Sequence, residues 1–258
     1  NTQSANGLLG EARNRAESAL VFNSEIAVPY IAIADSYLLQ DNDQAAIDTL
    51  ETALENDLVS SNMNLIVALG NIYMDQGRER LAAGNVAGAQ ESFGNANFQG
   101  FYAYTVDPHN EDSHRLRADA ALALDDPALA IAYISNPAPE DDYLEYFPDS
   151  PQAWRYLGDA RLAENDTRRA LEAYNQAVVL NGTDEQVAEA FIARADLYLA
   201  QGRFELALAD LNAALDRVDR PEVQATRMQT AYLVGDFEQA ETDADELLAM
   251  AVEEGDEA

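Results

Sequence analysis

Residues 151–182 read PQAWRYLGDARLAENDTRRALEAYNQAVVLNG, and this stretch decides the fold. Trp154 and Leu157 lie about one helical turn apart, so they share one face of a predicted first helix. The second predicted helix carries its small and apolar residues at a similar spacing, at Ala170, Tyr174 and Ala177. Gly158 has no side chain, which lets the second helix approach the first closely. The stretch therefore predicts two packed helices in which large side chains on one helix pack against small residues on the other.

The pattern of the second helix occurs six times along the chain. It consists of a small residue, an apolar residue four positions later and usually another small residue three beyond that. The instances are Ala46/Leu50/Ala53, Ala89/Phe93/Ala96, Ala130/Ile134, Ala170/Tyr174/Ala177, Ala207/Leu211/Ala214 and Ala240/Ala244/Leu247. Periods of about 20 to 50 residues are typical of stacked repeats. The sequence thus predicts an all-α fold, an α-solenoid that forms one elongated domain over residues 1–258.

The segment from Pro151 to Gly182 closely resembles the tetratricopeptide repeat. The resemblance lies in Trp154-x2-Leu157-Gly158 and Ala170-x3-Tyr174-x2-Ala177. Two positions depart from the family pattern, because Arg161 replaces a tyrosine and Gly182 stands where proline is usual. The resemblance implies a right-handed solenoid of about six helix pairs. It also implies a protein–protein interaction scaffold as the function.

Repeat boundaries follow from these patterns. We expect a half-repeat helix over residues 1–24, because Ala12, Ala16 and Ala19 lie 34 residues before Ala46, Leu50 and Ala53. The expected repeats span residues 25–58, 59–97, 107–137, 150–183, 185–219 and 221–252. An acidic, proline-rich loop is expected over 138–149 and an acidic tail over 253–258.

Two of the repeats depart from the regular spacing. Gly70 precedes Ala89 by 19 residues, whereas Ala34 precedes Ala46 by 12, so nearly two extra turns should make this hairpin protrude. Pro137 should end the second helix of the 107–137 repeat early. We expect linkers over 97–106, 107–113 and 136–151, and the aromatic rings in the first and last of these should pack back onto neighbouring helices rather than form a docking site.

Composition excludes several functions. The formal net charge of −32 would repel nucleic acid and anionic lipid, and no apolar run approaches the roughly 18 residues of a membrane span. Lysine and cysteine are absent, which removes Walker, Schiff-base and thiol chemistry. We therefore expect no enzyme activity and no cofactor. The chain starts at Asn1 rather than Met, so we expect a processed or trimmed product; an exported location, periplasmic, surface or extracellular, is favoured over a cytoplasmic one.

The two histidines are weak candidates for metal ligands, together with nearby carboxylates. The candidate residues are His109, His114, Asp141 and Asp142. The favoured alternative is that no metal binds, that Asp112 or Ser113 caps a helix, and that both imidazoles are exposed.

The family resemblance also implies a partner-binding surface. In the family, the first helix of each pair lines a concave groove. The ligand-facing positions fall on Asp35, Asn71, Asp119, Asp159, Asp196 and Gln229, with Arg115 and Arg155 one turn earlier. Such a groove should favour a basic or extended segment of a protein partner. The alternative is that an acidic chain simply has an acidic groove.

Both ends of the predicted array look unfinished. The end-to-end contact candidates are Leu8, Leu9, Leu247, Leu248 and Ala251. Solenoids usually cap their ends for solubility, so the chain could instead be a structural subunit of an extracellular filament or surface assembly that stacks through these residues. The alternative is that the first helix caps the stack and the last helix shields itself.

Overall fold

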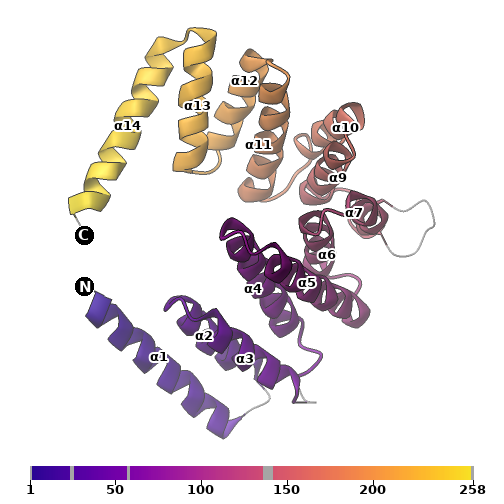
Figure 1. Cartoon of the computed structure of the whole chain (residues 1–258), viewed down its shortest axis with the longest axis vertical. Coiled ribbons are helices and arrows are strands. Elements are labelled where there is room, and N and C mark those ends of the chain that lie inside the picture. Colours follow the sequence, from indigo (N-terminus) through magenta and orange to yellow (C-terminus); the bar gives the residue numbers. More distant parts are fainter. Residues whose placement is uncertain (1, 24–25, 57–58, 136–141, 257–258) are drawn as a thin grey trace. The chain divides into compact units, whose positions relative to one another are not determined.

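The structure is a computed structural model of the chain, and it describes residues 2–23, 26–56, 59–135 and 142–256. Within these ranges all regular elements are helices and none is a strand, which confirms the predicted all-α class (Figure 1). The helices are α1 (Thr2–Phe22), α2 (Ala27–Leu38), α3 (Asp43–Leu54), α4 (Met63–Ala82), α5 (Val86–Val106), α6 (Glu111–Ala123), α7 (Pro127–Ile134), α8 (Tyr143–Tyr146), α9 (Pro151–Ala163), α10 (Thr167–Ala177), α11 (Asp184–Ala200), α12 (Phe204–Leu215), α13 (Pro221–Val234) and α14 (Phe237–Asp256).

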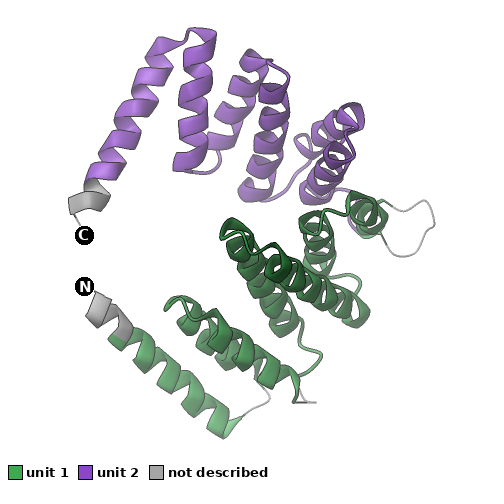
Figure 2. Cartoon of the chain, in the orientation of Figure 1, with its two compact units in different colours: residues 1–146 green, residues 147–258 purple. Residues whose placement is uncertain are grey.

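The helices form two compact units, residues 1–146 and 147–258 (Figure 2). In the first unit α1 packs on α2, and the pairs α2–α3, α4–α5 and α6–α7 follow, with the short α8 against α6 and α7. The second unit consists of the pairs α9–α10, α11–α12 and α13–α14. The described part of the chain thus contains the expected six helix pairs and the single helix that precedes them.

Each of the six pairs is joined by a turn of the same kind. In every turn, the residue two positions before the second helix has a positive φ. These residues are Asp41 (53°), Gly84 (77°), Asp125 (58°), Asn165 (63°), Gly202 (68°) and Gly235 (85°). Glycine, asparagine and aspartate are the residue types that best tolerate this left-handed conformation. The recurrence of one turn at one position identifies the pairs as copies of a single structural unit.

Helix starts are fixed by side-chain caps. Asn62, Ser150 and Thr183 accept backbone N–H groups at the starts of α4, α9 and α11. The expected cap of α6 is wrong: Asn110, rather than Asp112 or Ser113, accepts the Ser113 N–H at 3.2 Å. Helix α6 therefore begins at Glu111. The cap at Asn110 fixes the start of the helix between His109 and His114.

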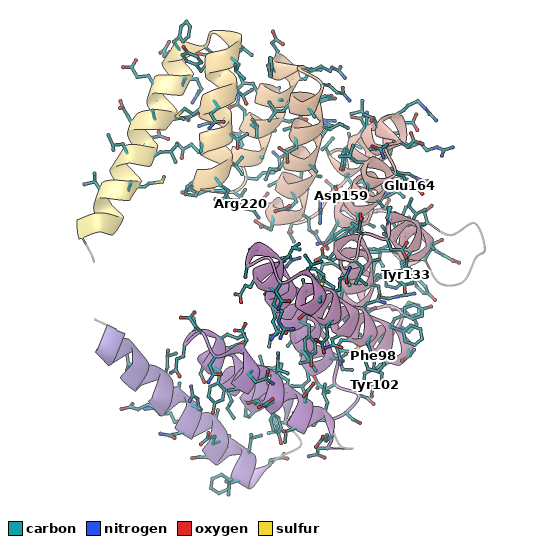
Figure 3. The ribbon with its side chains drawn as sticks, in the orientation of Figure 1. Phe98, Tyr102, Tyr133, Asp159, Glu164 and Arg220 are labelled. Atoms are coloured by element: carbon teal, nitrogen blue, oxygen red, sulfur yellow. The ribbon has the colours of Figure 1, made fainter. Side chains whose placement is uncertain are left out.

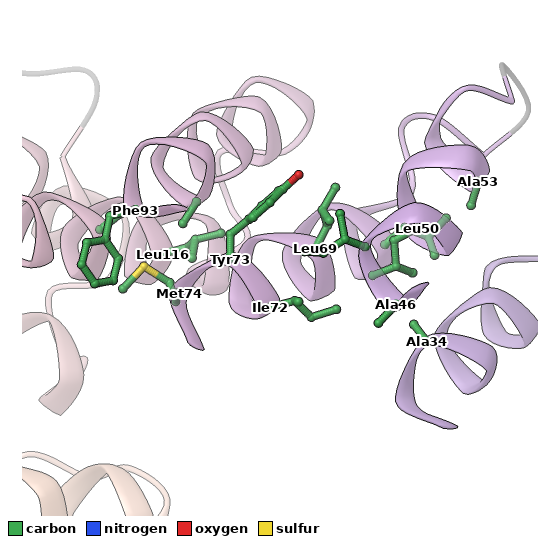
Figure 4. Close-up of a cluster of buried hydrophobic side chains, with 14 of the residues drawn as sticks. Ala34, Ala46, Leu50, Ala53, Leu69, Ile72, Tyr73, Met74, Phe93 and Leu116 are labelled. Atoms are coloured by element: carbon green, nitrogen blue, oxygen red, sulfur yellow. The ribbon is translucent and has the colours of Figure 1, made fainter. Parts of the chain in front are cut away.

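The core of the first unit is built from the small and apolar residues that the repeats predicted (Figure 4). Ala46 and Leu50 of α3 are fully buried, and Ala34 of α2 is 1% exposed. Helix α7 is only eight residues long, which confirms the expected early end of this repeat.

The α4–α5 pair shows that two predictions were wrong: Gly70 is not the glycine that faces α5, and the extra turns do not make the hairpin protrude. A Cβ atom on Gly77 would lie 2.3 Å from Phe93 Cε1, so Gly77 is the gap that receives the ring of the partner helix. Gly77 precedes Ala89 by 12 residues, the regular spacing. Gly70 instead makes room for Leu116 of α6, whose Cδ2 would lie 2.2 Å from the added atom. The extra turns of α4 thus pack against α6 and do not protrude.

The expected linker over 97–106 is also wrong, because α5 continues through it to Val106. Its extra turns pair with the extended start of α4, since antiparallel partners of matched length bury each other. The aromatic rings of this segment behave differently from one another. Phe98 and Phe101 are 63% and 51% exposed, against expectation, whereas the Tyr102 hydroxyl donates to the Ser60 carbonyl at 3.2 Å.

The second unit repeats the contact between a glycine and an aromatic ring. A Cβ atom on Gly158 of α9 would lie 2.3 Å from Tyr174 Cε1 of α10. In the next pair, Ala195 and Leu211 occupy the corresponding positions, and both are buried. The sequence prediction that bulk meets a gap is confirmed here. In the described residues, no helix combines the length and the apolar character needed to cross a bilayer.

Candidate functional site

Three of the predicted partner-binding residues of the second unit, Arg155, Asp159 and Asp196, interact with one another around Asp159 of α9, which Figure 3 labels. Arg155 lies one turn earlier on the same helix, and its Nη1 donates to Asp159 Oδ2 at 2.5 Å. The Tyr174 hydroxyl of α10 donates to Asp159 Oδ1 at 2.7 Å. Asp159 is therefore held by one cationic and one neutral donor, on two helices that the glycine contact brings close together.

Two pKa shifts describe the surroundings of Asp159. Burial raises the pKa of the Tyr174 hydroxyl, and the negative charge of Asp159 raises it further, so the phenol stays protonated and remains a donor. Burial opposes the charge of Arg155, but Asp159 and neighbouring groups raise the pKa of its guanidinium above the ordinary value. The Arg155 guanidinium also lies 4.0 Å from the centroid of the Tyr156 ring. Arg155 therefore stays protonated, and its guanidinium forms an ion pair with Asp159.

Asp196 is the carboxylate of this surface whose charge is not balanced. It lies on α11, which packs beside α9, and its side chain is exposed. Within the described residues no hydrogen bond or ion pair joins it to a donor. Partial burial raises its pKa, and the negative charge of Asp159 adds to the shift. The α9–α11 surface, defined by Asp159 and Asp196, thus carries an uncompensated negative charge.

In the first unit, the predicted residues form contacts across α4 and α6. Arg115 Nη2 donates to Asn71 Oδ1 at 2.9 Å, so two of them are brought together. Asp119 accepts from Arg78 Nη2 at 2.7 Å, and Arg78 also pairs with Asp75. The prediction missed Arg78, because α4 was aligned one heptad out of register.

The remaining predicted residues are more dispersed. Asp35 and Gln229 are exposed on α2 and α13. Of the end-contact candidates, Leu8 and Leu248 are 66% and 64% exposed, and Ala251 is also exposed, whereas Leu9 and Leu247 are partly buried. Their role in contacts between copies stays a prediction.

The histidine segment differs from the expectation of two exposed imidazoles. His109 is exposed, but His114 is 1% exposed and its Nε2 lies 2.8 Å from the Pro108 carbonyl oxygen. The rings of Tyr104 and Tyr143 lie 5.2 and 5.4 Å from the His114 ring. Burial lowers the pKa of His114, so the imidazole is neutral near neutral pH.

The same segment bears on metal binding. Asp141 lies outside the described residues, and Asp142 Oδ1 accepts the Glu145 N–H at 2.6 Å. Across the described ranges, no group of three or more histidine, aspartate and glutamate side chains is placed to hold a metal ion. His114 is instead part of an aromatic cluster in the interior of the first unit.

Sequence reasoning missed two arginine bridges in the second unit. Arg194 of α11 donates two hydrogen bonds to Asp210 of α12, at 2.7 and 2.8 Å, and a third to Asn175 of α10 at 2.8 Å. Thirty-three residues later, Arg227 of α13 donates to Asp243 of α14 at 2.5 and 3.0 Å and to Asn212 of α12 at 3.2 Å. The recurrence of an arginine 16 residues before an aspartate was the available signal.

These bridges join helices in a fixed way. Each arginine lies on the first helix of a pair, binds the aspartate on the second helix of that pair and reaches back to an asparagine of the preceding pair. We call this arrangement the arginine bridge. It joins the two helices of a pair to each other, and it joins that pair to the preceding pair.

Comparison with protein families gives one match. A model described as the tetratricopeptide repeat matches residues 74–136, 141–185, 157–220 and 192–233, which together make up more than half of the chain. No curated protein matches the sequence.

Solved structures share the fold at low sequence identity. A tetratricopeptide repeat protein from Parabacteroides merdae ATCC 43184 aligns with a TM-score of 0.63 and 15% identity, over 95% of this chain and 87% of that one. The thermophilic protein TTC0263 from Thermus thermophilus aligns with a TM-score of 0.58 and 16% identity, over 79% and 97%. The Cut9–Hcn1 structure of the APC/C aligns with a TM-score of 0.62 and 14% identity, over 95% of this chain and 43% of that one. These likenesses concern the fold.

Proposed function

The chain belongs to the tetratricopeptide repeat family, and we propose that it is a protein-interaction scaffold whose α9–α11 surface holds a basic, extended segment of a partner protein. Repeats of this family are generally protein–protein interaction modules, and their fold is generally a non-catalytic scaffold. The proposal thus assigns a positively charged partner segment to the second unit.

The observation that carries the proposal is the unbalanced charge of Asp196. Its pKa is raised by partial burial and by Asp159, so its ionised form is held at a cost in free energy. A cation from a partner would relieve this cost by pairing with the exposed carboxylate. An arginine or lysine side chain in an extended segment fits this requirement, and the net charge of −32 adds long-range attraction.

Asp159 contributes differently from Asp196. Arg155 and Tyr174 already donate to both of its oxygens. These donors inside the unit partly compensate its negative charge. Asp159 should therefore attract a cationic partner less strongly than Asp196 does. Asp196 is the better residue to change, because its side chain has no structural partner to lose within the described residues.

The test is binding of a labelled decapeptide of alternating arginine and serine, measured by fluorescence anisotropy at low and high salt. We expect Asp196→Arg to weaken binding roughly tenfold or more, because a repulsive charge replaces an attractive one. We also expect binding to weaken with salt. Binding should weaken further as the pH falls through the raised pKa of Asp196, since the protonated side chain no longer attracts a cation.

Asp184→Arg is the matched control, because Asp184 is also exposed on α11 and the substitution changes the net charge equally. It should leave affinity within about twofold of the native value. Equal losses in the two variants would show that only net charge matters, and the assignment to Asp196 would then be abandoned.

A further inference from the structure

A hollow of about 410 Å³ opens in the first unit between α1, α2 and α3. Its lining includes Glu17 of α1, Tyr30, Ile33 and Tyr37 of α2, and Asp48 and Thr49 of α3. The hollow thus offers carboxylate and hydroxyl oxygens beside aromatic and aliphatic side chains. We call it the α1–α3 hollow.

The same positions of a later repeat hold an arginine bridge. The register is fixed by Ala34 of α2 and Ala195 of α11, which are both buried. Each of them precedes the small residue that opens the pattern of the next helix by 12 residues. In this register, Ile33 occupies the position of Arg194.

The groups around the Arg194 guanidinium have counterparts that line the hollow. The guanidinium donates to Asp210 and Asn175. Its Cζ atom lies 5.6 and 5.8 Å from the ring centroids of Phe191 and Tyr198. The corresponding residues, in the same order, are Thr49, Glu17, Tyr30 and Tyr37. The hollow therefore has the surroundings of a bridge arginine, with isoleucine in place of the arginine itself.

Glu17 makes the hollow a stronger acceptor than its counterpart. Glu17 and Asn175 each stand five positions after the small residue of their helix pattern, at Ala12 and Ala170. A carboxylate thus replaces a neutral amide. A guanidinium bonds more strongly to a carboxylate than to an amide, because the bond is charge-assisted.

The acceptors of the hollow are not taken by arginines of the chain. Among the described residues, no arginine bonds to Glu17 or Asp48, and Asp48 accepts from Gln44 Nε2 at 2.7 Å. The Thr49 hydroxyl donates to the Ala45 carbonyl at 2.7 Å, so its oxygen can still accept. A guanidinium, which carries donors and no acceptor, matches this set.

Arg13 does not supply the guanidinium. Its Cζ atom lies 3.7 Å from the Tyr37 ring centroid, but its nitrogens donate to Ser36 and Gln40, and neither residue lines the hollow. The Tyr198 ring of the second unit contacts two guanidinium groups. One such contact therefore does not prevent a tyrosine ring from contacting another.

The corresponding positions of two other pairs are less suited to an arginine. In α4–α5, the position of the bridge arginine is held by Gln76, which accepts from the Ser92 hydroxyl at 2.8 Å. In α9–α10, a hollow of about 420 Å³ is lined by Arg161 and Arg169, which disfavours a further cation. Of these described pairs, α2–α3 is the one that combines acidic acceptors with a missing arginine.

We propose that the α1–α3 hollow binds an arginine side chain of a partner protein, in the place that Arg194 takes in α11–α12. The guanidinium pairs with Glu17 and lies beside the rings of Tyr30 and Tyr37. The site belongs to the first unit and recognises one guanidinium group rather than the charge of an extended segment, so it goes beyond the function proposed above.

The first test uses N-acetyl-arginine amide, titrated into the full chain with NMR-labelled methyl groups. We expect saturable shifts of the Leu20, Ile33 and Thr49 signals, because these residues line the hollow. N-acetyl-citrulline amide, of similar shape but neutral, should bind roughly tenfold more weakly. N-acetyl-lysine amide should bind roughly fivefold more weakly, because an ammonium lacks the planar fork. Equal binding of the arginine and lysine probes would overturn the proposal.

Glu17→Gln should weaken binding of the arginine probe roughly fivefold, because it removes the charged acceptor. Glu11→Gln is the matched control, since Glu11 is exposed on the same helix, lies outside the hollow and changes the net charge equally. It should change affinity by less than about twofold. Equal losses in the two variants would overturn the assignment. Asp196→Arg should leave the methyl shifts in place, so this proposal and the α9–α11 proposal fail separately.

A filled variant tests the position itself. Ile33→Arg with Thr49→Asp rebuilds the arginine bridge in α2–α3, and it should abolish the probe-induced shift of the Leu20 methyl signals. Circular dichroism and cooperative melting check that the variant is folded. A shift that persists in the folded variant would contradict the proposal. If the variant does not fold, the Glu17 and Glu11 variants decide the question by themselves.

Two other occupants are outcomes of the same experiments. Free arginine carries a carboxylate that Glu17 and Asp48 repel, so it should bind more weakly than the amide; tighter binding would identify a small-molecule site and overturn the proposal. Light scattering of the protein alone should show a species of about 28 kDa. Larger assemblies that disappear in Glu17→Gln would show that a second copy supplies the arginine, and the proposal of a foreign partner would be wrong.

Discussion

The hairpins α4–α5 and α9–α10 contain the same contact between a glycine and an aromatic ring, but they differ greatly in length. Gly77 receives Phe93 in the first, and Gly158 receives Tyr174 in the second, with the same sequence separation of 16 residues. Helices α4 and α5 have 20 and 21 residues, whereas α9 and α10 have 13 and 11. The repeated feature is thus the register of the contact nearest the turn. Helix length is free to vary at the far end.

The far end of the longer hairpin has its own packing partner. Gly70 and Gly100, on the extra turns of α4 and α5, both lie against α6, where an added Cβ would meet Leu116 or Arg117. The insertion is therefore stabilised by the next repeat. The difference between the hairpins teaches that a tetratricopeptide hairpin can lengthen at the end far from its turn if the neighbouring pair buries the added turns.

Truncation of the two rings should have the largest effect on stability. Phe93→Ala and Tyr174→Ala each empty the space above a glycine, and we expect a loss of about 3–5 kcal/mol in the free energy of unfolding. Native-state hydrogen exchange, read separately for each hairpin, measures the loss where it occurs. Phe98→Ala is the matched control, because Phe98 is 63% exposed, and it should change stability by less than about 0.5 kcal/mol. If only one of the two variants lost stability in its hairpin, the two contacts would not be equivalent.

Filling the glycine gaps should have a smaller effect. Gly77→Ala and Gly158→Ala place a methyl group 2.3 Å from an aromatic carbon, and overpacking of this kind costs about 1–3 kcal/mol. Urea titration of the free energy of unfolding measures the cost. Gly94→Ala in α5 is the control, since an added Cβ there meets nothing within 4 Å; it should stabilise the helix by up to about 1 kcal/mol.

A compensating change sharpens the same comparison. The double variant Gly158→Ala with Tyr174→Leu reproduces the buried Ala195 and Leu211 pair of the next repeat. We expect it to be less destabilised than the sum of the two single variants. Simple additivity would mean that the glycine and the ring are not paired as the structure shows.

The smallest expected effect is a pH dependence confined to the first unit. Both histidines lie there, and burial lowers the pKa of His114 below the ordinary value of 6.5. The unfolded chain therefore binds a proton more readily than the folded unit does. The stability that the neutral imidazole contributes is present above pH 6.5 and is lost as the pH falls below it.

Hydrogen exchange at pH 7.5 and pH 6.0 measures this dependence in the two units. His114→Gln should remove it, whereas His109→Gln, at an exposed side chain, should leave it unchanged. An equal loss of protection in both units would show that carboxylates, and not His114, set the response.

Sequence patterns alone predicted the helix pairs, their number and the small residues that face each other across them. Periodic apolar residues and turn-forming residues act within one or two helices, so their consequences can be read locally. The early end of α7 also follows from local chemistry, because no helix continues easily into proline.

Only the tertiary structure decided which glycine of α4 faces Phe93 and that His114 is buried. Gly70 and Gly77 lie a heptad apart on one helix, and the choice depends on where α5 packs, which no local pattern states. The burial of His114 depends on Tyr104 and Tyr143, which reach it from α5 and α8. Contacts between separate repeats are set by packing, and packing is a property of the assembled helices.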